Sequence, residues 1–316
     1  MKICLISFDY WGFDRHIIKE LKQGGHEAYH INLDNFKYEH PSFPHRLKNF
    51  FTKVILKKNI KRLKRQEYVL EALKDMGHMD RILVIRPDLL NVETHQAIKR
   101  HTTQYIAYLY DSTKRFAVNH LLDGLFSKIY SFDENDVKQY GFQHLTNYIY
   151  LPKKEIPVNK NYRQQVFIVI SADERLNTLN KIASQLQSIN ISYRFIVKAN
   201  RKPAGLHENI EFTKNEIWHD QLIALLDESE IFLDLIRHGH NGLSFRVFEA
   251  LAHQKKLITT NASIKNYDFY NPQNIAVIDP DNINIDPSFF SGSYEPLSNE
   301  VYNKYTIKEW VRRVFS

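Results

Sequence analysis

The chain has 316 residues, 43% of them hydrophobic and 25% charged, and its formal net charge is +7. This composition is typical of a globular, core-forming protein with room for two domains, and it excludes disordered and fibrous classes. The single cysteine, Cys4, excludes a disulfide framework and a cysteine-based metal site. The positive charge permits an anionic partner without choosing among nucleic acid, membrane and phosphorylated substrate.

Short apolar runs alternate with amphipathic segments through the first half of the chain. The runs that predict buried strands are residues 2–7, 27–33, 82–87, 105–111, 128–132 and 147–152. Residues 14–23 predict a helix that Gly24 and Gly25 end. This alternation favours a parallel sheet covered by helices on both faces.

The N-terminal apolar run is interrupted by Asp9 too soon to be a signal peptide. No apolar run approaches the roughly 18 residues of a membrane span. We therefore expect a cytoplasmic protein.

One basic segment stands apart from the alternating pattern. Residues 46–65 contain nine Lys or Arg and no acid, beside apolar residues that include Phe50 and Phe51. This pattern is typical of an interfacial helix that contacts an anionic membrane. A solvated surface helix and a part of an acceptor cleft are the alternatives. No nucleic-acid-binding motif accompanies the charge, so nucleic acid is not an expected partner.

A polar stretch with two prolines near Pro152 predicts a linker, and the alternation then restarts. Strands are expected at 166–171, 193–198 and 209–212, and helices at 174–187, about 217–226, and 299–315. We expect three parts: an N-terminal α/β domain over 1–155, a second over 156–295, and a C-terminal helix within 296–316.

The most informative stretch is residues 231–261, where two apolar runs enclose a helical pattern. The connection of about 19 residues is long enough for a right-handed βαβ crossover. The helix is predicted to begin after Gly242 with Ser244 as its cap, and Val247, Phe248 and Leu251 can pack on the sheet.

Gly242, Arg246, Glu249 and His253 fall on another face of that helix. In open α/β sheets, ligands bind beyond the carboxyl ends of strands, and a helix N-terminus there attracts anions. Arg246 can bind phosphate oxygens and Glu249 a ribose diol, which suits an anionic ligand that carries a sugar. The simpler alternative is an Arg–Glu pair on a solvated surface.

The stretch GLSFRVFEALAHQKKLITTN, residues 242–261, resembles the donor-site helix of GT-B glycosyltransferases. It is similar to bacterial spore-maturation-type and capsule- or lipopolysaccharide-associated members of that fold. The segments YLYDSTKRF, FSKIYSFDENDVKQYG and NYIYLP resemble the part of those proteins before the interdomain linker, so the likeness covers roughly residues 80–280. The chain is short for the fold. The usual second glutamate before the glycine loop is absent, and His238 and His240 occupy that region.

The resemblance implies two Rossmann-like domains that face a cleft, with a C-terminal helix that crosses back to the N-terminal domain through Trp310, Val311 and Phe315. The first domain would bind the acceptor and the second the nucleotide-sugar donor. The reaction would move a sugar to a cell-surface polysaccharide or lipid-linked glycan. No cofactor other than the donor substrate is implied. No metal is implied either, because GT-B enzymes generally do without one and no Asp-x-Asp motif occurs near a strand end.

By the same resemblance, Glu249 would bind the ribose and Arg246 the diphosphate. The remaining residues of the donor site would be Lys198, Arg175, His240, Gly242 and Ser244.

A base for the acceptor hydroxyl would come from the N-terminal half, where the candidates are Asp111, Asp14 and His16. Asp111 ends the predicted strand at 105–111. Asp14 could instead be only the N-cap of the first helix, and Asp111 could cap a turn. A retaining reaction would need no such base, and the sequence leaves the stereochemistry open. An epimerase and a non-catalytic glycan-binding protein of the same fold are the alternatives.

Overall fold

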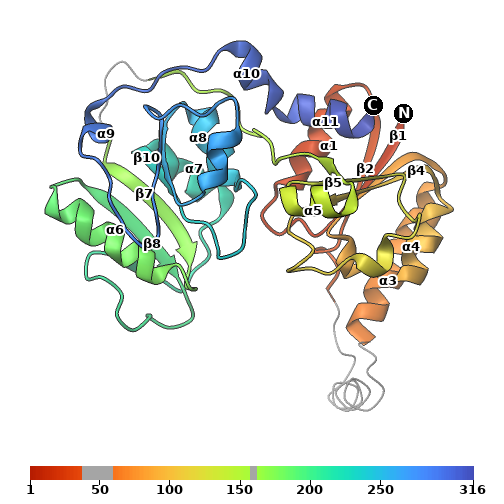
Figure 1. Cartoon of the computed structure of the whole chain (residues 1–316). Coiled ribbons are helices and arrows are strands. Elements are labelled where there is room, and N and C mark those ends of the chain that lie inside the picture. The colour runs from red at the N-terminus through yellow and green to blue at the C-terminus, as the bar shows by residue number, and fades with distance from the viewer. Residues whose placement is uncertain (38–59, 157–161) are drawn as a thin grey trace. The chain divides into compact units, whose positions relative to one another are not determined.

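The computed structural model describes residues 1–37, 60–156 and 162–316. They form two compact units, residues 1–145 with 314–316, and residues 146–313. Each unit contains one parallel six-stranded sheet (Figure 1). Of the basic segment 46–65, residues 46–59 lie outside the described residues.

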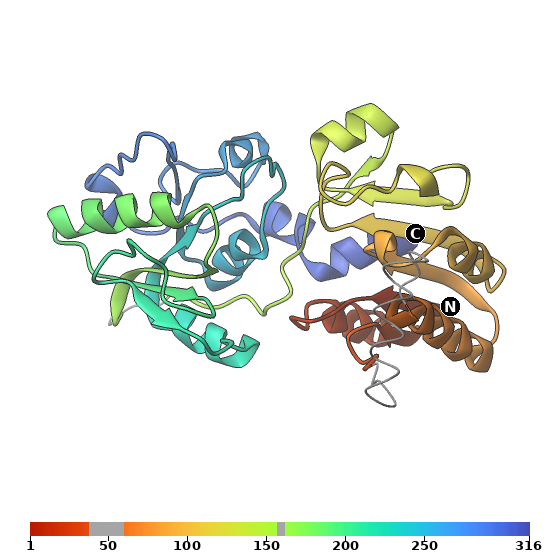
Figure 2. The same cartoon turned by 90° about the horizontal axis from the view of Figure 1, so that it is seen from below.

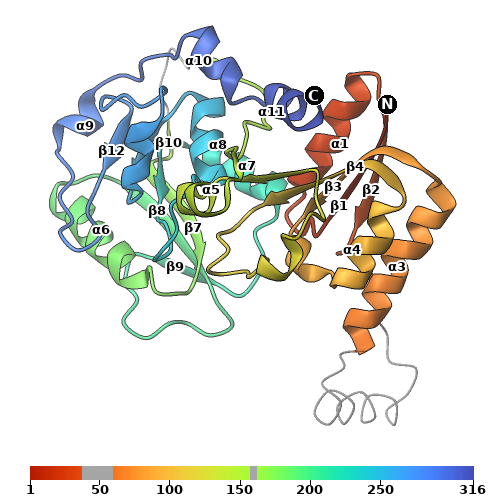
Figure 3. The ribbon, with the colours of Figure 1, turned by 45° about the vertical axis from the view of Figure 1, so that its right-hand side comes forward.

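The first unit is a sheet with helices on both faces (Figure 3). Its strands, in spatial order, are β2 Glu27–Asn32, β1 Lys2–Ser7, β3 Met79–Ile85, β4 Thr102–Leu109, β5 Lys128–Ser131 and β6 Gln143–His144. Its helices are α1 Asp14–Gln23, α3 Ile60–Met76, α4 Val92–Lys99 and α5 Glu134–Tyr140. Cys4 and Ile6 of β1 pack in one buried cluster with Val69 and Leu73 of α3. Ile3 and Leu5, which alternate with them along β1 and so point to the other face of the sheet, are also fully buried.

The second unit repeats this plan. Its strands, in spatial order, are β12 Ile275–Val277, β11 Lys256–Thr259, β10 Ser229–Asp234, β7 Gln164–Ser171, β8 Tyr193–Lys198 and β9 Glu211–Thr213. Its helices are α6 Leu176–Ser188, α7 His219–Asp227, α8 Phe245–His253, α9 Ser288–Ser291, α10 Asn299–Lys304 and all but the last two residues of α11 Ile307–Phe315. Helix α6 covers one face of the sheet, and α7 and α8 cover the other (Figures 1 and 2).

Two local predictions are wrong. Residues 147–152 form no strand; Ile149 makes one isolated bridge to Thr306. The backbone of Ile149 accepts the N–H of Ile307 at 2.9 Å and donates to Tyr305 at 2.7 Å. These bonds take backbone groups that a continuous helix over 299–315 would need, so the chain breaks there into α10 and α11.

The end of α11 agrees with the predicted C-terminal helix. Residues 314–316 group with the first unit, where the Lys128 ammonium donates to the backbone oxygen of Ser316 at 3.1 Å. Earlier in the helix, the Trp310 indole donates to Thr146 O at 3.1 Å within the second unit. In the part of the chain that the structure describes, no helix combines the length and apolar character needed to cross a bilayer.

Candidate functional site

The carboxyl edge of the second sheet carries the loop between β10 and α8. Two side chains that follow β11 hold this loop in place: Asn261 Nδ2 donates to Gly242 O at 3.0 Å, and Ser263 Oγ donates to Asn241 O at 2.8 Å. His240 lies in the same loop and is half-buried. Its backbone N–H donates a hydrogen bond to Arg237 O at 3.1 Å. Because parallel strands end at the same edge, this is the position where open α/β sheets bind ligands.

Helix α8 begins as predicted. Ser244 is its N-cap, and its Oγ accepts the N–H of Arg246 at 3.1 Å. The buried carboxylate of Asp234, the last residue of β10, accepts hydrogen bonds from Ser244 Oγ at 2.7 Å and Thr259 Oγ1 at 2.9 Å. The cap is therefore tied to two strands of the sheet, and the positive end of the helix dipole stays at the carboxyl edge. The predicted packing face is also confirmed, because Val247, Phe248 and Leu251 are buried.

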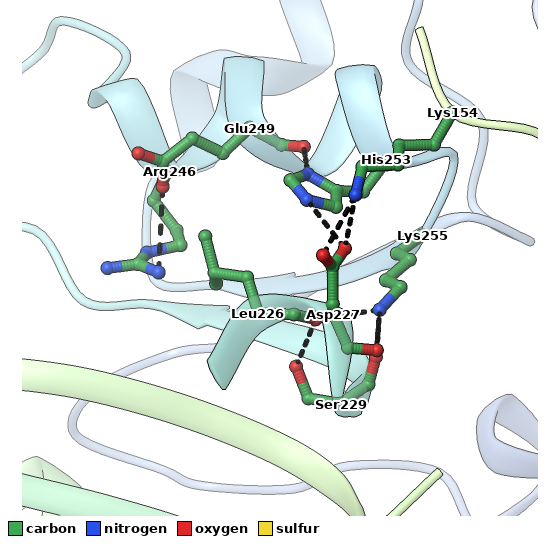
Figure 4. A network of polar contacts seen from close by, with 8 residues as sticks. All are labelled: Lys154, Leu226, Asp227, Ser229, Arg246, Glu249, His253 and Lys255. Carbon is green, nitrogen blue, oxygen red and sulfur yellow. Dashed lines mark hydrogen bonds and ion pairs between the residues drawn. The ribbon is translucent and has the colours of Figure 1, made fainter. Parts of the chain in front are cut away.

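Arg246 and Glu249 form a buried pair rather than a solvated one, so the surface alternative is wrong. Arg246 Nη1 lies 3.5 Å from Glu249 Oε2, and their side chains are 13% and 2% exposed (Figure 4). The other oxygen, Glu249 Oε1, accepts a hydrogen bond from Tyr150 OH at 2.6 Å. Burial and the negative charge of Glu249 raise the pKa of Tyr150 far above its usual range, so this hydroxyl stays a donor. A carboxylate has about four acceptor positions, and the hydrogen bond from Tyr150 uses one of them.

The C-terminal end of α8 is fixed by a second polar network (Figure 4). His253 donates to Glu249 O at 2.9 Å, and its Nε2 lies 3.2 Å from Asp227 Oδ1. Lys154 Nζ donates to both oxygens of Asp227 at 2.8 Å. Lys255 Nζ donates to the backbone oxygens of Leu226, Asp227 and Ser229, and burial lowers the pKa of Lys255 to about 8. The His253 side chain therefore contacts groups inside the second unit and does not face the expected ligand.

The predicted phosphate contact Arg175 lies just beyond β7, in an ion pair that the sequence did not reveal. Asp173 accepts hydrogen bonds from Arg175 Nε at 2.8 Å and Nη2 at 2.6 Å, and from Arg237 Nε at 3.2 Å. Burial opposes ionisation of Asp173, but the hydrogen bonds from the two arginines prevail and lower its pKa. Arg175 Nη1 also donates to Leu235 O at 2.9 Å, which links this pair to the end of β10.

Lys198, the last residue of β8, forms an ion pair with Glu216. Arg175, Arg237 and Lys198 therefore place three cations at the ends of adjacent strands, each beside a carboxylate. A diphosphate could replace these carboxylates, because its oxygens accept the same charge-assisted hydrogen bonds.

The carboxyl edge of the first sheet carries the three candidate bases. Asp14 and His16 lie in the first turn of α1, and Asp111 follows β4 by two residues. Asp111 is already engaged: its Oδ1 accepts the N–H of Ser112 at 3.1 Å, and its Oδ2 lies 2.6 Å from Arg115 Nη1.

Asp14 has a different environment. It is 1% exposed, and its Oδ1 accepts a hydrogen bond from Tyr110 OH at 2.6 Å. Burial and the neighbouring charge of Asp9 raise the pKa of Asp14 to about 7, against the opposing effect of hydrogen bonds from Tyr110 and Ser7. Ser7 Oγ in turn lies 2.9 Å from His30 Nε2, so a chain of polar groups runs inward from Tyr110.

The N-cap alternative for Asp14 is wrong. The carboxylate of Asp9 takes that role, since it accepts the N–H of Asp14 at 3.1 Å and of Arg15 at 3.0 Å. Within the described residues, no three His, Cys, Asp or Glu side chains are arranged to hold a metal ion.

No protein-family model matches the chain, and no curated protein matches it in sequence. Solved structures do match its fold over nearly the whole length. AviGT4, a glycosyltransferase involved in avilamycin A biosynthesis, matches with a TM-score of 0.60 at 10% identity, over 99% of this chain and 95% of that one. The trehalose-6-phosphate synthase OtsA matches with a TM-score of 0.59 at 12% identity, over 100% and 98%.

UDP-GlcNAc 2-epimerase from Neisseria meningitidis, solved with UDP-GlcNAc bound, matches with a TM-score of 0.51 at 8% identity, over 100% of this chain and 98% of that one. At such identities the likeness establishes the fold. The chain has a GT-B-like structure of two Rossmann-like units, as predicted.

Proposed function

We propose that the protein is a metal-independent glycosyltransferase that moves a sugar from a nucleotide-sugar donor to a cell-surface polysaccharide or a lipid-linked glycan, as in the capsule- and lipopolysaccharide-associated enzymes that residues 242–261 resemble. The observation that carries the proposal is the buried Arg246–Glu249 pair on a capped helix, beside three cations at adjacent strand ends. The Arg246 guanidinium can bind the charged part of a ligand, and the Glu249 carboxylate can accept further hydrogen bonds from its hydroxyl groups.

In this proposal the diphosphate lies at the N-terminus of α8. Arg246 binds it there, while Arg175 and Lys198 exchange their carboxylate partners for phosphate oxygens. Glu249 accepts hydrogen bonds from the ribose and is held in orientation by Tyr150. The cations and the helix dipole then stabilise the diphosphate as it leaves.

For the acceptor hydroxyl we propose Asp14 as the base, ahead of Asp111 and His16. A pKa of about 7 leaves a large fraction of Asp14 ionised at neutral pH, near the optimum for general base catalysis. Because Asp14 is buried and Tyr110 only half-buried, the acceptor proton would reach Asp14 through the Tyr110 hydroxyl, which donates its own proton to Asp14 as it accepts the new one. Asp111 ranks lower because Arg115 and the backbone already engage its carboxylate.

Donor binding is the first test of the proposal. Calorimetry with UDP, GDP, CDP and dTDP should identify one that binds, and failure of all four would contradict the donor site. Nucleotide-sugars of the base that binds are then incubated with and without glycan acceptors.

A transferase releases nucleoside diphosphate and adds sugar to the acceptor. An epimerase, which the likeness to the Neisseria enzyme favours as the second candidate, converts the sugar with no acceptor present. A non-catalytic glycan-binding protein does neither.

A further inference from the structure

The first unit carries a surface of exposed apolar side chains that the proposed reaction does not use. Among the described residues, six large hydrophobic side chains are exposed, and four of them fall in two short segments of this unit. Phe8, Tyr10 and Trp11 lie in the loop after β1, and Leu63 lies in the first turn of α3. Trp11 is 47% exposed and Leu63 is 43% exposed. Clustered exposure of this kind marks an interaction surface more often than scattered single residues do.

The two segments form one surface. The guanidinium carbon of Arg65 lies 5.9 Å from the centre of the Phe8 ring, which places the second turn of α3 against the loop. Tyr10 and Trp11 pack edge to face with their ring centres 5.0 Å apart. We call residues 8–11 together with 60–65 the aromatic–basic surface.

The charge of this surface is mainly positive, with Asp9 as its one acidic residue. The start of α3 carries Lys61, Arg62, Lys64 and Arg65, with no acidic residue in the first turn, and Glu67 pairs with Lys64 at 2.5 Å. Like charges three and four residues apart on a helix repel one another, so helix stability does not favour this placement. A partner of opposite charge gives the placement a physical reason.

The polar groups of the loop favour a lipid surface over a carbohydrate as the partner. Protein sites for sugars need side-chain hydrogen-bonding groups that reach the hydroxyls beside the aromatic rings. Asp9, half-buried, directs both carboxylate oxygens at the N–H groups of Asp14 and Arg15, and the carboxylate of Asp14, in α1, is buried against Tyr110. The exposed side chains of the surface are mainly aromatic rings and cations.

We propose that the aromatic–basic surface docks on a phospholipid bilayer that contains anionic lipids. Tyrosine and tryptophan rings favour the headgroup level of a bilayer, and lysine and arginine stems extend along apolar surface while their charges stay at the headgroups. Trp11, the most exposed ring of the loop, would enter deepest, and Lys61 and Arg62 lie on the same side of α3 as Arg65, which contacts the loop. The surface lies wholly within the first unit, and the proposal does not depend on which sugar or nucleotide the second unit binds.

Vesicle binding of the full chain tests the aromatic half of the surface. Phosphatidylcholine vesicles with and without phosphatidylglycerol are compared by co-sedimentation and tryptophan fluorescence. We expect binding that requires phosphatidylglycerol, decreases with salt and shifts the emission to shorter wavelength. Trp11→Ala should weaken binding about fivefold or more and abolish the emission shift. Trp218→Ala is the matched control, because Trp218 is 53% exposed but belongs to the second unit, and it should bind as wild type does.

A charge reversal tests the basic half. Lys61→Glu should weaken binding about fivefold or more, the effect of one basic residue near an anionic surface. Lys74→Glu is the control, since it changes the same charge in the same helix about 20 Å away. Melting temperatures confirm that each variant is folded.

Three results would overturn the proposal. The first is equal binding to neutral and anionic vesicles, or none to either. The second is unchanged binding by Trp11→Ala and Lys61→Glu, which would place any lipid contact elsewhere in the chain. The third is a Trp11 emission that responds to soluble oligosaccharide and not to vesicles, which would assign the loop to acceptor recognition instead.

Discussion

Replacing Asp14 with asparagine should change how the stability of the protein depends on pH. The pKa of Asp14 is about 7 in the folded chain, against 3.8 for an aspartate in water. Between these values the folded chain holds a proton that the unfolded chain releases, so this group loses its stabilising contribution as pH rises from 3.8 to 7. At 1.36 kcal/mol for each unit of pH, the loss between pH 5 and pH 8 is about 3 kcal/mol. The asparagine side chain has no proton to lose and keeps nearly the same shape.

Urea denaturation at pH 5 and pH 8 measures this difference directly. The free energy of unfolding of wild type should fall between the two pH values by about 3 kcal/mol more than that of Asp14→Asn. Asp75→Asn, which removes an exposed carboxylate from α3, should leave the wild-type difference in place. Parallel pH dependence of wild type and Asp14→Asn would refute the argument that Asp14 is buried with a proton near neutral pH, and with it the reason for preferring Asp14 as the base.

Four further variants test the site. Arg246→Ala and Glu249→Ala should each weaken binding of the preferred nucleoside diphosphate by about 1–3 kcal/mol in calorimetry, because each removes charge-assisted hydrogen bonds; wild-type affinity in both would remove the donor site from α8. Ser244→Ala should lower the free energy of unfolding by about 1 kcal/mol, since it removes the N-cap and the bond to Asp234, and an unchanged urea midpoint would contradict that role. Asp111→Asn should lower the melting temperature through loss of the Arg115 pair and leave turnover of the folded protein within about tenfold; a loss of two to four orders of magnitude at unchanged melting temperature and donor affinity would make Asp111 the base.

The sequence predicted well those elements whose ends carry a chemical signal. Helix α1 spans the predicted residues because Gly24 and Gly25 end it, and α8 starts where Ser244 can cap it. Strand β8 likewise has the predicted bounds, since its apolar run is flanked by polar residues on both sides. In these cases the local residues alone determine the boundary.

Residues 147–152 show where that reasoning fails. Tyr148 and Ile149 are buried, so their apolar character fits a strand, but they are buried in a connection that packs against Trp310 and Phe245. An apolar run reports burial and not backbone pairing. The backbone partner of Ile149 is Tyr305, which is too distant in sequence for any local pattern to reveal.

The same limit applies to the site. Spacing along one helix indicated that Arg246 and Glu249 could act together, because residues three apart are neighbours on a helix. Tyr150, the hydrogen-bond partner of Glu249, lies 99 residues earlier, and Arg237 reaches Asp173 across 64 residues. Those contacts depend on the order of strands in the sheet. The single available signal was the position of Asp173 and Arg175 directly after a predicted strand.

The two ends of α8 are held independently, at the start by Asp234 and at the end by the network around Asp227 and Lys255. A nine-residue helix anchored in this way has little freedom to slide or rotate when a ligand arrives. Recognition of different nucleotide bases would then have to evolve in the loop before Gly242, while the helix remains a constant support. This separates the part of the protein that could be redesigned for a new donor from the part that must be left intact, and it makes the side chains of residues 238–241 the natural place to alter donor choice while α8 stays in position.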